Sequence, residues 1–351
     1  MDSVSQRCGG NHQQNKEELN MSKTFTMPPE WAPHVRCWMA WPCRLSQWPN
    51  GLDKACKAYA DVANLIVEFE PVVMVCRPQD EAQARKLLTN RVSLLTMPLD
   101  DSWMRDFGPT FVYDEVRTKV GVNWRFNGWG KYTYEQDQHV ARQILSHLDV
   151  PCEDSPLVNE GGAIHVDGEG SLMVTETVQM NANRNPGLTK QAVEAELSRT
   201  LGVRNVIWLP QGLVDDDTDG HIDELACFTG PGQILALVSS DPKDANYGIL
   251  QRNLDVLKAA RDALGNPYDV VTIEQPPASY RDGVRLSMSY VNFYIANGGI
   301  VMPSYGFTDY DQEALKVMAQ CFPHHQIEQV NSSEIVEGGG NIHCITQQEP
   351  V

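Results

Sequence analysis

One local pattern recurs five times along this chain, and this recurrence restricts the possible folds more than any other feature. In each copy a helix with amphipathic spacing precedes a short apolar strand, a loop and two strands joined by a tight turn. The predicted helices cover residues 53–69, 138–148, 188–201, 246–264 and 309–321. Repeats of this length are typical of solenoids and propellers.

The last copy ends on a single strand beginning at residue 342, so its pair is incomplete. The apolar segment 35–41 near the start can supply the missing strand and leave no exposed edge. We therefore predict an α/β fold, a five-bladed pseudo-fivefold propeller of ββαβ modules whose ring is closed by an N-terminal strand. A doubly wound sheet is the alternative. It is less favoured because strands joined by two-residue turns, such as Asp167-Gly168, must be antiparallel.

Composition limits the surroundings and the partners of the protein. Residues 1–27 are polar and predict a disordered N-terminal tail and no signal peptide, followed by a single catalytic domain over residues 28–351. A net charge of −18 argues against nucleic acid and anionic membranes and suits a small cationic substrate. Nine cysteines without a CxxC pair indicate reduced thiols in the cytoplasm. A homodimer or a higher homo-oligomer is compatible with this sequence.

A candidate nucleophile stands close to the C-terminus. Residues 338–344 read Gly-Gly-Gly-Asn-Ile-His-Cys and echo residues 160–166, Glu-Gly-Gly-Ala-Ile-His-Val, so that Cys344 takes the place of Val166. A lone cysteine is more often a small core residue than a catalyst. The exchange of an apolar residue for a thiol after a glycine turn nevertheless favours a catalytic cysteine.

Five loops precede the five strand pairs, and four of them contain a group suited to catalysis. These groups are Asp106, Glu160, His221 with Asp223, and Cys344. In a closed ring they meet at the axis, where three carboxylates and an imidazole form a pocket for a cation beside a thiol. Guanidinium fits best, since carboxylates such as Asp106 and Asp223 can hold its fork of donors. A thiolate can attack its carbon, and His221 can protonate departing ammonia and deprotonate the incoming water.

Each of these residues also has a purely structural interpretation. Asp106 can form an ion pair with Arg105, and Glu160 can simply close a turn. His343 and its echo His165 are best explained by a structural hydrogen bond within the repeat.

The sequence resembles the agmatine deiminases of the guanidino-modifying superfamily from about residue 27 to residue 351. The motifs that carry the resemblance are residues 338–348 (Gly-Gly-Gly-Asn-Ile-His-Cys-Ile-Thr-Gln-Gln), 220–223 (Gly-His-Ile-Asp), 103–106 (Trp-Met-Arg-Asp) and 123–130 (Asn-Trp-Arg-Phe-Asn-Gly-Trp-Gly). The resemblance implies a five-bladed α/β propeller and the hydrolysis of agmatine to N-carbamoylputrescine and ammonia, without metal or cofactor. It implies that Cys344 is the nucleophile, His221 the general acid and base, and Asp106 and Asp223 the guanidinium clamps. Glu160 then orients the substrate.

The far end of the substrate is predicted from three features. The resemblance implies that Trp103 forms a wall of the substrate channel, although core packing explains this residue equally well. Residues 131–134, Lys-Tyr-Thr-Tyr, form a shorter loop than in the best-known agmatine deiminases and look more like the bacterial peptidyl-arginine deiminase branch. Asp217, in the acidic run 215–217, is a candidate acceptor for a distal amine, whereas such a run is most often a solvated loop.

Three other functions compete with this prediction. Arginine or peptidyl-arginine could be the substrate of the same chemistry. A metal-dependent hydrolase could use Asp217, Asp219, His221, Asp223, His343 and Cys344 as ligands, although their spacing matches no HExxH or CxxC pattern. A catalytically silent guanidinium-binding propeller is the third alternative.

Overall fold

The computed structural model describes residues 24–351 of the chain. Most of the predicted N-terminal tail, residues 1–23, lies outside the described residues. Ordered structure begins before residue 28, however, because Phe25 and Met27 are buried and Thr26 forms a β-bridge with Tyr113. These apolar side chains belong to a hydrophobic cluster that also contains apolar side chains of residues 112–124 and 157–174.

The described residues form a mixed α/β fold, as predicted. The strands are β1 (His34–Ala40), β2 (Val72–Cys76), β3 (Ser93–Thr96), β4 (Thr110–Tyr113), β5 (Lys119–Arg125), β6 (Cys152–Val158), β7 (His165–Val166), β8 (Ser171–Thr175), β9 (Asn205–Leu209), β10 (Ala226–Gly230), β11 (Gln233–Val238), β12 (Asp269–Glu274), β13 (Tyr280–Arg281), β14 (Val284–Arg285), β15 (Tyr294–Ala296), β16 (Gly299–Ser304), β17 (Gln326–Asn331) and β18 (Thr346–Pro350). The α-helices are α1 (Leu52–Ile66), α2 (Glu81–Leu87), α3 (Met104–Phe107), α4 (Val140–Leu148), α5 (Glu176–Gln179), α6 (Lys190–Leu201), α7 (Tyr247–Ala259), α8 (Thr308–Cys321) and α9 (Ser333–Val336).

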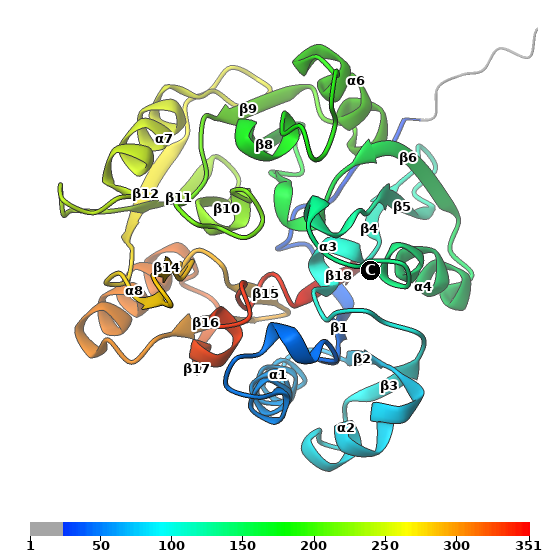
Figure 1. Cartoon of the computed structure of the whole chain (residues 1–351). Coiled ribbons are helices and arrows are strands. Elements are labelled where there is room, and N and C mark those ends of the chain that lie inside the picture. The colour runs from blue at the N-terminus through cyan, green and yellow to red at the C-terminus, as the bar shows by residue number, and fades with distance from the viewer. Residues whose placement is uncertain (1–23) are drawn as a thin grey trace, which may run out of the picture.

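Five sheets share one order of strands. Each starts with an antiparallel pair and continues with a parallel strand, as in β4-β5-β6, β7-β8-β9, β10-β11-β12 and β15-β16-β17. The parallel strand follows a crossover helix (α1, α4, α6, α7 or α8), as the geometry of parallel pairing requires. Figure 1 shows these units following one another around the molecule, with the five helices outside and α3 and β18 near the centre.

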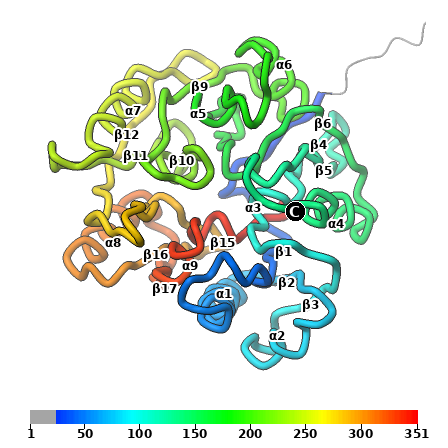
Figure 2. The backbone as a smooth tube through the Cα atoms, in the orientation of Figure 1, coloured from blue at the N-terminus to red at the C-terminus, as the bar shows by residue number. Residues whose placement is uncertain are grey.

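The two ends of the chain share a sheet, in the order β18-β1-β2-β3. Strand β1 pairs antiparallel with β18, with Trp38 opposite Gln347, and parallel with β2. Figure 2 shows the blue N-terminal strand beside the red C-terminal segment. The pairing predicted for the segment 35–41 is therefore present. Because β1 supplies the strand that the last copy lacks, the loop with Cys344 is held by the start of the chain.

Several elements differ from the sequence prediction. The first sheet gains an additional strand, β3, after helix α2, and a separate two-stranded sheet, β13-β14, lies between β12 and β15. Residues 289–293 and 342–345 form turns instead of strand, so that β15 and β18 start later than predicted. Backbone hydrogen bonds explain why residues 342–345 form a turn: the N–H of Thr346 donates to the carbonyl of His343, and the N–H of His343 donates to the carbonyl of Asn292.

Amphipathic helices anchor these units to the core. In α1, Tyr59, Val62 and Ile66 are fully buried at the spacing of one helical face. Each large apolar side chain buried in this way stabilises the fold by about 1.5–3 kcal/mol. Within the described residues, every helix is too short or too polar to span a membrane.

Candidate active site

Cys344 lies in the turn that leads into β18, where the preceding glycines allow two tryptophans to approach the main chain. A Cβ atom at Gly340 would collide with the indole of Trp103, and one at Gly338 with that of Trp48. The thiol lines a cavity of ≈ 320 Å³ that opens to solvent, although the residue is only 5% exposed. The glycine run therefore places a nearly buried thiol in an aromatic-walled cavity.

Three of the predicted groups surround the main chain of Gly162, and Cys344 lies beside one of them. A Cβ atom on this residue would lie 2.6 Å from Nδ1 of His221 and 2.9 Å from both Oδ1 of Asp106 and Oδ2 of Asp223. Oδ2 of Asp223 is also 3.7 Å from Sγ of Cys344. The structure thus brings a thiol, an imidazole and two carboxylates from three different loops into one site.

Asp223 has one oxygen engaged and one available. Its Oδ2 is 2.8 Å from Nδ1 of His343, while its buried Oδ1 has no hydrogen-bond partner among the described residues. Burial alone raises the pKa of Asp223, but the hydrogen bond and charge of His343 and the charge of His221 lower it further than burial raises it. Asp223 is therefore a carboxylate with a free acceptor beside the thiol.

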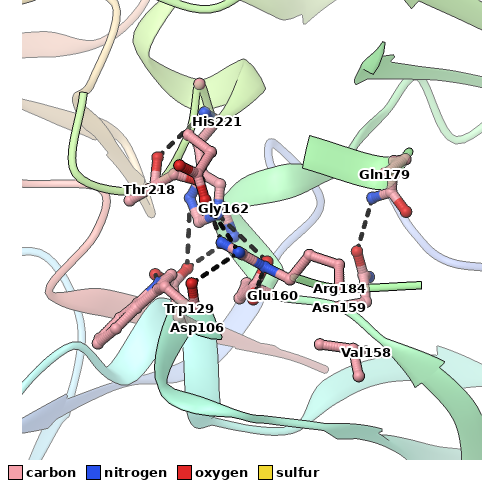
Figure 3. Close-up of polar contacts among 12 residues, drawn as sticks. Asp106, Trp129, Val158, Asn159, Glu160, Gly162, Gln179, Arg184, Thr218 and His221 are labelled. Atoms are coloured by element: carbon pink, nitrogen blue, oxygen red, sulfur yellow. Dashed lines mark hydrogen bonds and ion pairs between the residues drawn. The ribbon is translucent and has the colours of Figure 1, made fainter. Parts of the chain in front are cut away.

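Asp106 lies in α3 and is held by two donors (Figure 3). The N–H of Gly162 donates to Oδ1 over 3.0 Å, and Nε1 of Trp129 donates to Oδ2 over 2.9 Å. Trp129 has φ 56° and ψ 19°, a left-handed conformation that is rare for a bulky residue. Burial raises the pKa of Asp106 to about 6, with His221 opposing the increase and Asp223 and Glu160 adding to it.

His221 and Glu160 form a buried pair behind the cavity, and Arg184 supports it (Figure 3). Nε of Arg184 donates to Oε1 of Glu160 over 2.6 Å, and Oε2 of Glu160 is 3.4 Å from Nε2 of His221. Burial alone lowers the pKa of His221, but Asp106, Glu160 and Asp223 outweigh it and raise this pKa to about 9. Burial alone raises the pKa of Glu160, and Arg184 and His221 bring it below its ordinary value. His221 is therefore an imidazolium at neutral pH.

The thiol is neutral in the empty site. Burial raises the pKa of Cys344 well above its ordinary value, and the nearby acids Asp223, Glu224 and Asp106 add to the effect. A thiolate next to these acids requires another positive charge. A bound cation would supply it.

Trp103 and Asp217 also line the cavity. Trp103 stacks on Trp48 with ring centroids 5.8 Å apart, so it packs in the core and forms a wall at the same time. Asp217 lies toward the outside, with its side chain 37% exposed. The hydroxyl of Tyr132 donates to its Oδ2 over 2.6 Å. Both residues are thus placed to contact a ligand that reaches Cys344.

A buried cluster beneath the site was not predicted from the sequence. Glu30 accepts from Arg105 over 3.2 Å and lies 2.9 Å from Nε2 of His343 and 3.7 Å from Nε2 of His165. Arg105 therefore pairs with Glu30, and the proposed ion pair with Asp106 is not formed. Burial alone raises the pKa of Glu30, but His343, Arg105 and His165 together lower it well below its ordinary value. The two histidines of the sequence echo thus share one carboxylate.

Asn292 is a second residue that sequence analysis missed. It is fully buried, and its Nδ2 lies 3.2 Å from Sγ of Cys344. The signal was present in the repeat, because the loop before β15 was the one loop without a candidate group. Arg184 offered no such signal, since it lies outside the five loops.

A metal-dependent hydrolase would need a cluster of ligating side chains. Over residues 24–351, no three side chains of His, Cys, Asp or Glu are arranged in a way that could hold a metal ion.

Comparison with known proteins establishes the family. The family model of the Porphyromonas-type peptidyl-arginine deiminases matches residues 26–350. The chain belongs to this family. A Legionella pneumophila protein provisionally named an agmatine deiminase is 46% identical over 330 residues, which cover 93% of this chain and 95% of that protein. The agmatine deiminase of Stutzerimonas stutzeri is 42% identical over 93% of this chain and 95% of its own length.

A solved structure agrees with these relatives. The agmatine deiminase of Enterococcus faecalis superimposes with a TM-score of 0.89 at 34% identity, and the match covers 93% of this chain and 96% of that one. The mixed α/β fold predicted for the chain is therefore that of this family.

Proposed function

We propose that this protein is an agmatine deiminase, a hydrolase that cleaves a C–N bond of the guanidinium group of agmatine. The products are N-carbamoylputrescine and ammonia, which makes the reaction a step of putrescine and polyamine biosynthesis. The observation that carries this proposal is the thiol of Cys344, 3.7 Å from the carboxylate of Asp223 in an acidic cavity. Relatives named agmatine deiminase, at 42% identity or more for the bacterial ones cited above, support it.

Asp106 and Asp223 bind the guanidinium group. The free Oδ1 of Asp223 accepts one substrate N–H, and Asp106 accepts others beside the donors that already fix its oxygens. Hydrogen bonds between charged partners are about twice as strong as neutral ones. The two carboxylates therefore hold the planar cation with its central carbon facing Sγ of Cys344.

The substrate activates its own nucleophile. Its positive charge offsets the acids that raise the pKa of Cys344, so the thiol releases its proton to the solvent, to which the cavity opens, when the cation is bound. Sulfur then attacks the guanidinium carbon, a C–S bond forms, and a neutral tetrahedral adduct results. His221, protonated at neutral pH, gives its proton to one amino group. The C–N bond breaks, ammonia leaves, and a thiouronium cation remains on Cys344.

Water completes the reaction. His221, now neutral, takes a proton from a water molecule as its oxygen bonds to the thiouronium carbon. The C–S bond then breaks, the remaining hydroxyl proton passes to sulfur, and the urea product leaves. Glu160 orients His221 through the contact at 3.4 Å and stabilises its charged form. Arg184 fixes Glu160 in turn.

The lining of the cavity favours an amine-tailed substrate over free arginine. Among the described residues that line this cavity, the acidic side chains are Asp106 and Asp217, and none is a lysine or an arginine. A substrate carboxylate would thus find no cationic partner among these lining side chains. Lys131 lies 3.9 Å from Oδ1 of Asp217 at the outer end, and Arg281 and Arg285 line the adjoining cavity. The ammonium of agmatine finds Asp217 in the outer part, and Trp103 covers the aliphatic chain between the two ends.

The framework of this enzyme is part of the same proposal. We propose a single catalytic domain over residues 28–351, a five-bladed propeller that the β1–β18 pairing closes. The eight cysteines of residues 24–351 are free, which is consistent with a cytoplasmic enzyme. A homodimer or a higher homo-oligomer remains part of the hypothesis, to be tested by sedimentation.

One experiment separates the candidate substrates. Purified protein is incubated in parallel with agmatine, arginine and an arginyl peptide, and the release of ammonia is measured. We expect turnover of agmatine at least ten times faster than that of the other two. Preference for the peptide would instead support a peptidyl-arginine deiminase, and no turnover of any substrate would leave a guanidinium-binding protein. Activity lost to a chelator and restored by metal would support the metal-dependent alternative.

A further inference from the structure

The loop before β15, where the sequence indicated no candidate group, also reaches the reacting sulfur. Asn292 stands two positions before Tyr294, the first residue of β15, and Cys344 stands two positions before Thr346, the first residue of β18. The two residues therefore occupy equivalent places in adjacent copies of the pattern. The other three loops place Asp106, Glu160 and the pair His221 and Asp223 in the same site.

The amide of Asn292 has only one satisfactory orientation. Its Oδ1 accepts from the backbone N–H of His343 over 2.8 Å and lies 3.4 Å from that of Cys344. A flipped amide would point its own N–H groups at these two donors. Nδ2 therefore lies on the side of Asp223, 3.4 Å from its carbonyl oxygen and 3.2 Å from Sγ of Cys344, while Oδ1 is 3.5 Å from the same sulfur.

This donor contacts sulfur in surroundings that oppose negative charge. Asp223 and Asp106 are both close, and Asn292 is fully buried, so water does not compete for its N–H. A neutral amide offers a proton to the thiolate and adds no charge that would repel a cationic substrate. It can also hold Sγ in one position relative to the clamps.

We propose that Asn292 is a catalytic residue that orients Cys344 and stabilises its thiolate through the Nδ2–H donor. This inference rests on the proposed function, in which Cys344 is the nucleophile. It assigns distinct tasks to the two halves of one amide. Oδ1 fixes the turn before β18, and Nδ2 acts on the sulfur.

Two variants separate these tasks. Asn292→Asp keeps an acceptor for the backbone N–H groups and replaces the donor with an oxygen facing sulfur, whereas Asn292→Ala removes both. Asn253→Asp is the matched control, because Asn253 is buried in α7 and its Nδ2 donates to the carbonyl of Gln211, in another part of the molecule. Iodoacetamide labelling of Cys344 is followed against pH without substrate, by mass spectrometry of its peptide, and agmatine kinetics are measured in parallel.

The proposal predicts an order of effects. The midpoint pH of labelling should rise from wild type to N292A and further to N292D, and kcat should fall about 10- to 100-fold with a smaller change in KM. N253D should match wild type in both assays. A purely structural role predicts instead that N292D works better than N292A.

The proposal is wrong if folded N292D and N292A have the labelling profile and the kcat of wild type. If N292D does not fold, N292A alone decides. Labelling reports on sulfur without any substrate. A failure of the proposed function would appear separately: wild-type protein would release no ammonia from agmatine, or Cys344→Ala would remain active and Cys344 would not be the nucleophile.

Discussion

A methyl group added to Gly162 tests whether the candidate catalytic groups act together. The Cβ of Gly162→Ala would lie 2.6 Å from His221 Nδ1 and 2.9 Å from one oxygen each of Asp106 and Asp223. Optimal non-bonded separations are about 3.5 Å or more, so each group must move by about 0.6–0.9 Å. The backbone at Gly162 lies outside the left-handed region, and alanine therefore adds no φ strain of its own.

The size of the expected effect follows from these displacements. A misplacement of about 1 Å in an active site can lower the rate roughly 100-fold, or about 2.7 kcal/mol of transition-state stabilisation. Here three groups move at once, so kcat/KM for agmatine should fall at least ~100-fold. Gly230→Ala is the matched control, since its Cβ would meet nothing within 4 Å and its backbone is equally permissive.

The assay is the initial rate of ammonia release, with thermal unfolding of both variants measured alongside. Gly230→Ala should stay within about twofold of wild type. A near-normal rate in folded Gly162→Ala would show that the three side chains are not both close-packed around Gly162 and catalytic.

Three further predictions concern charge. The pH profile of kcat/KM for agmatine should be bell-shaped. Asp106, with a pKa raised to about 6, must lose its proton, whereas His221, with a pKa of about 9, must keep its proton. Initial rates measured from about pH 5 to about pH 10 that fall on neither side would contradict this prediction. Glu30→Gln should lower the free energy of unfolding by about 3 kcal/mol at neutral pH, as measured by urea titration, because it leaves Arg105 without its buried counter-charge and His343 with Asp223 alone. The pKa of Glu30 is depressed in the folded state, so the stability that its charge contributes is present above the unfolded pKa of about 4.3 and is lost as the pH falls through the folded pKa. The difference in unfolding free energy between Glu30→Gln and wild type should therefore decrease below about pH 4. A difference that stays constant with pH would indicate lost packing instead. Asp217→Asn should raise KM for agmatine about tenfold with little change in kcat, whereas a fall in kcat alone would remove this residue from the amine site.

The repeated pattern made most of the fold accessible from sequence. Apolar periodicity identified the five crossover helices, and turn residues such as Asp167-Gly168 identified antiparallel pairs. These signals are local, and the structure preserves them. The loop positions of Asp106, Glu160, His221 and Cys344 followed from the same pattern, because equivalent loops lie at equivalent places in a repeat.

The features that escaped sequence analysis depend on contacts between distant segments. Residues 289–293 (Ser-Tyr-Val-Asn-Phe) contain residue types that favour strands, but Asn292 within them instead supports the turn of Cys344. Glu30 contacts Arg105 of α3, His165 of β7 and His343 of the turn before β18, so no spacing in the chain predicts the cluster. The echoed histidines were expected to make structural hydrogen bonds, and their common partner became visible only in three dimensions.

The central claim is that the sulfur of Cys344 forms a bond to the guanidinium carbon. It is tested most directly by mixing enzyme with agmatine for a fraction of a turnover, quenching in acid and mapping the peptides by mass spectrometry. The account predicts a thiouronium adduct on the peptide containing Cys344, absent in Cys344→Ala, which should also be inactive. An unmodified Cys344 throughout turnover, or ammonia release by the alanine variant, would contradict the account.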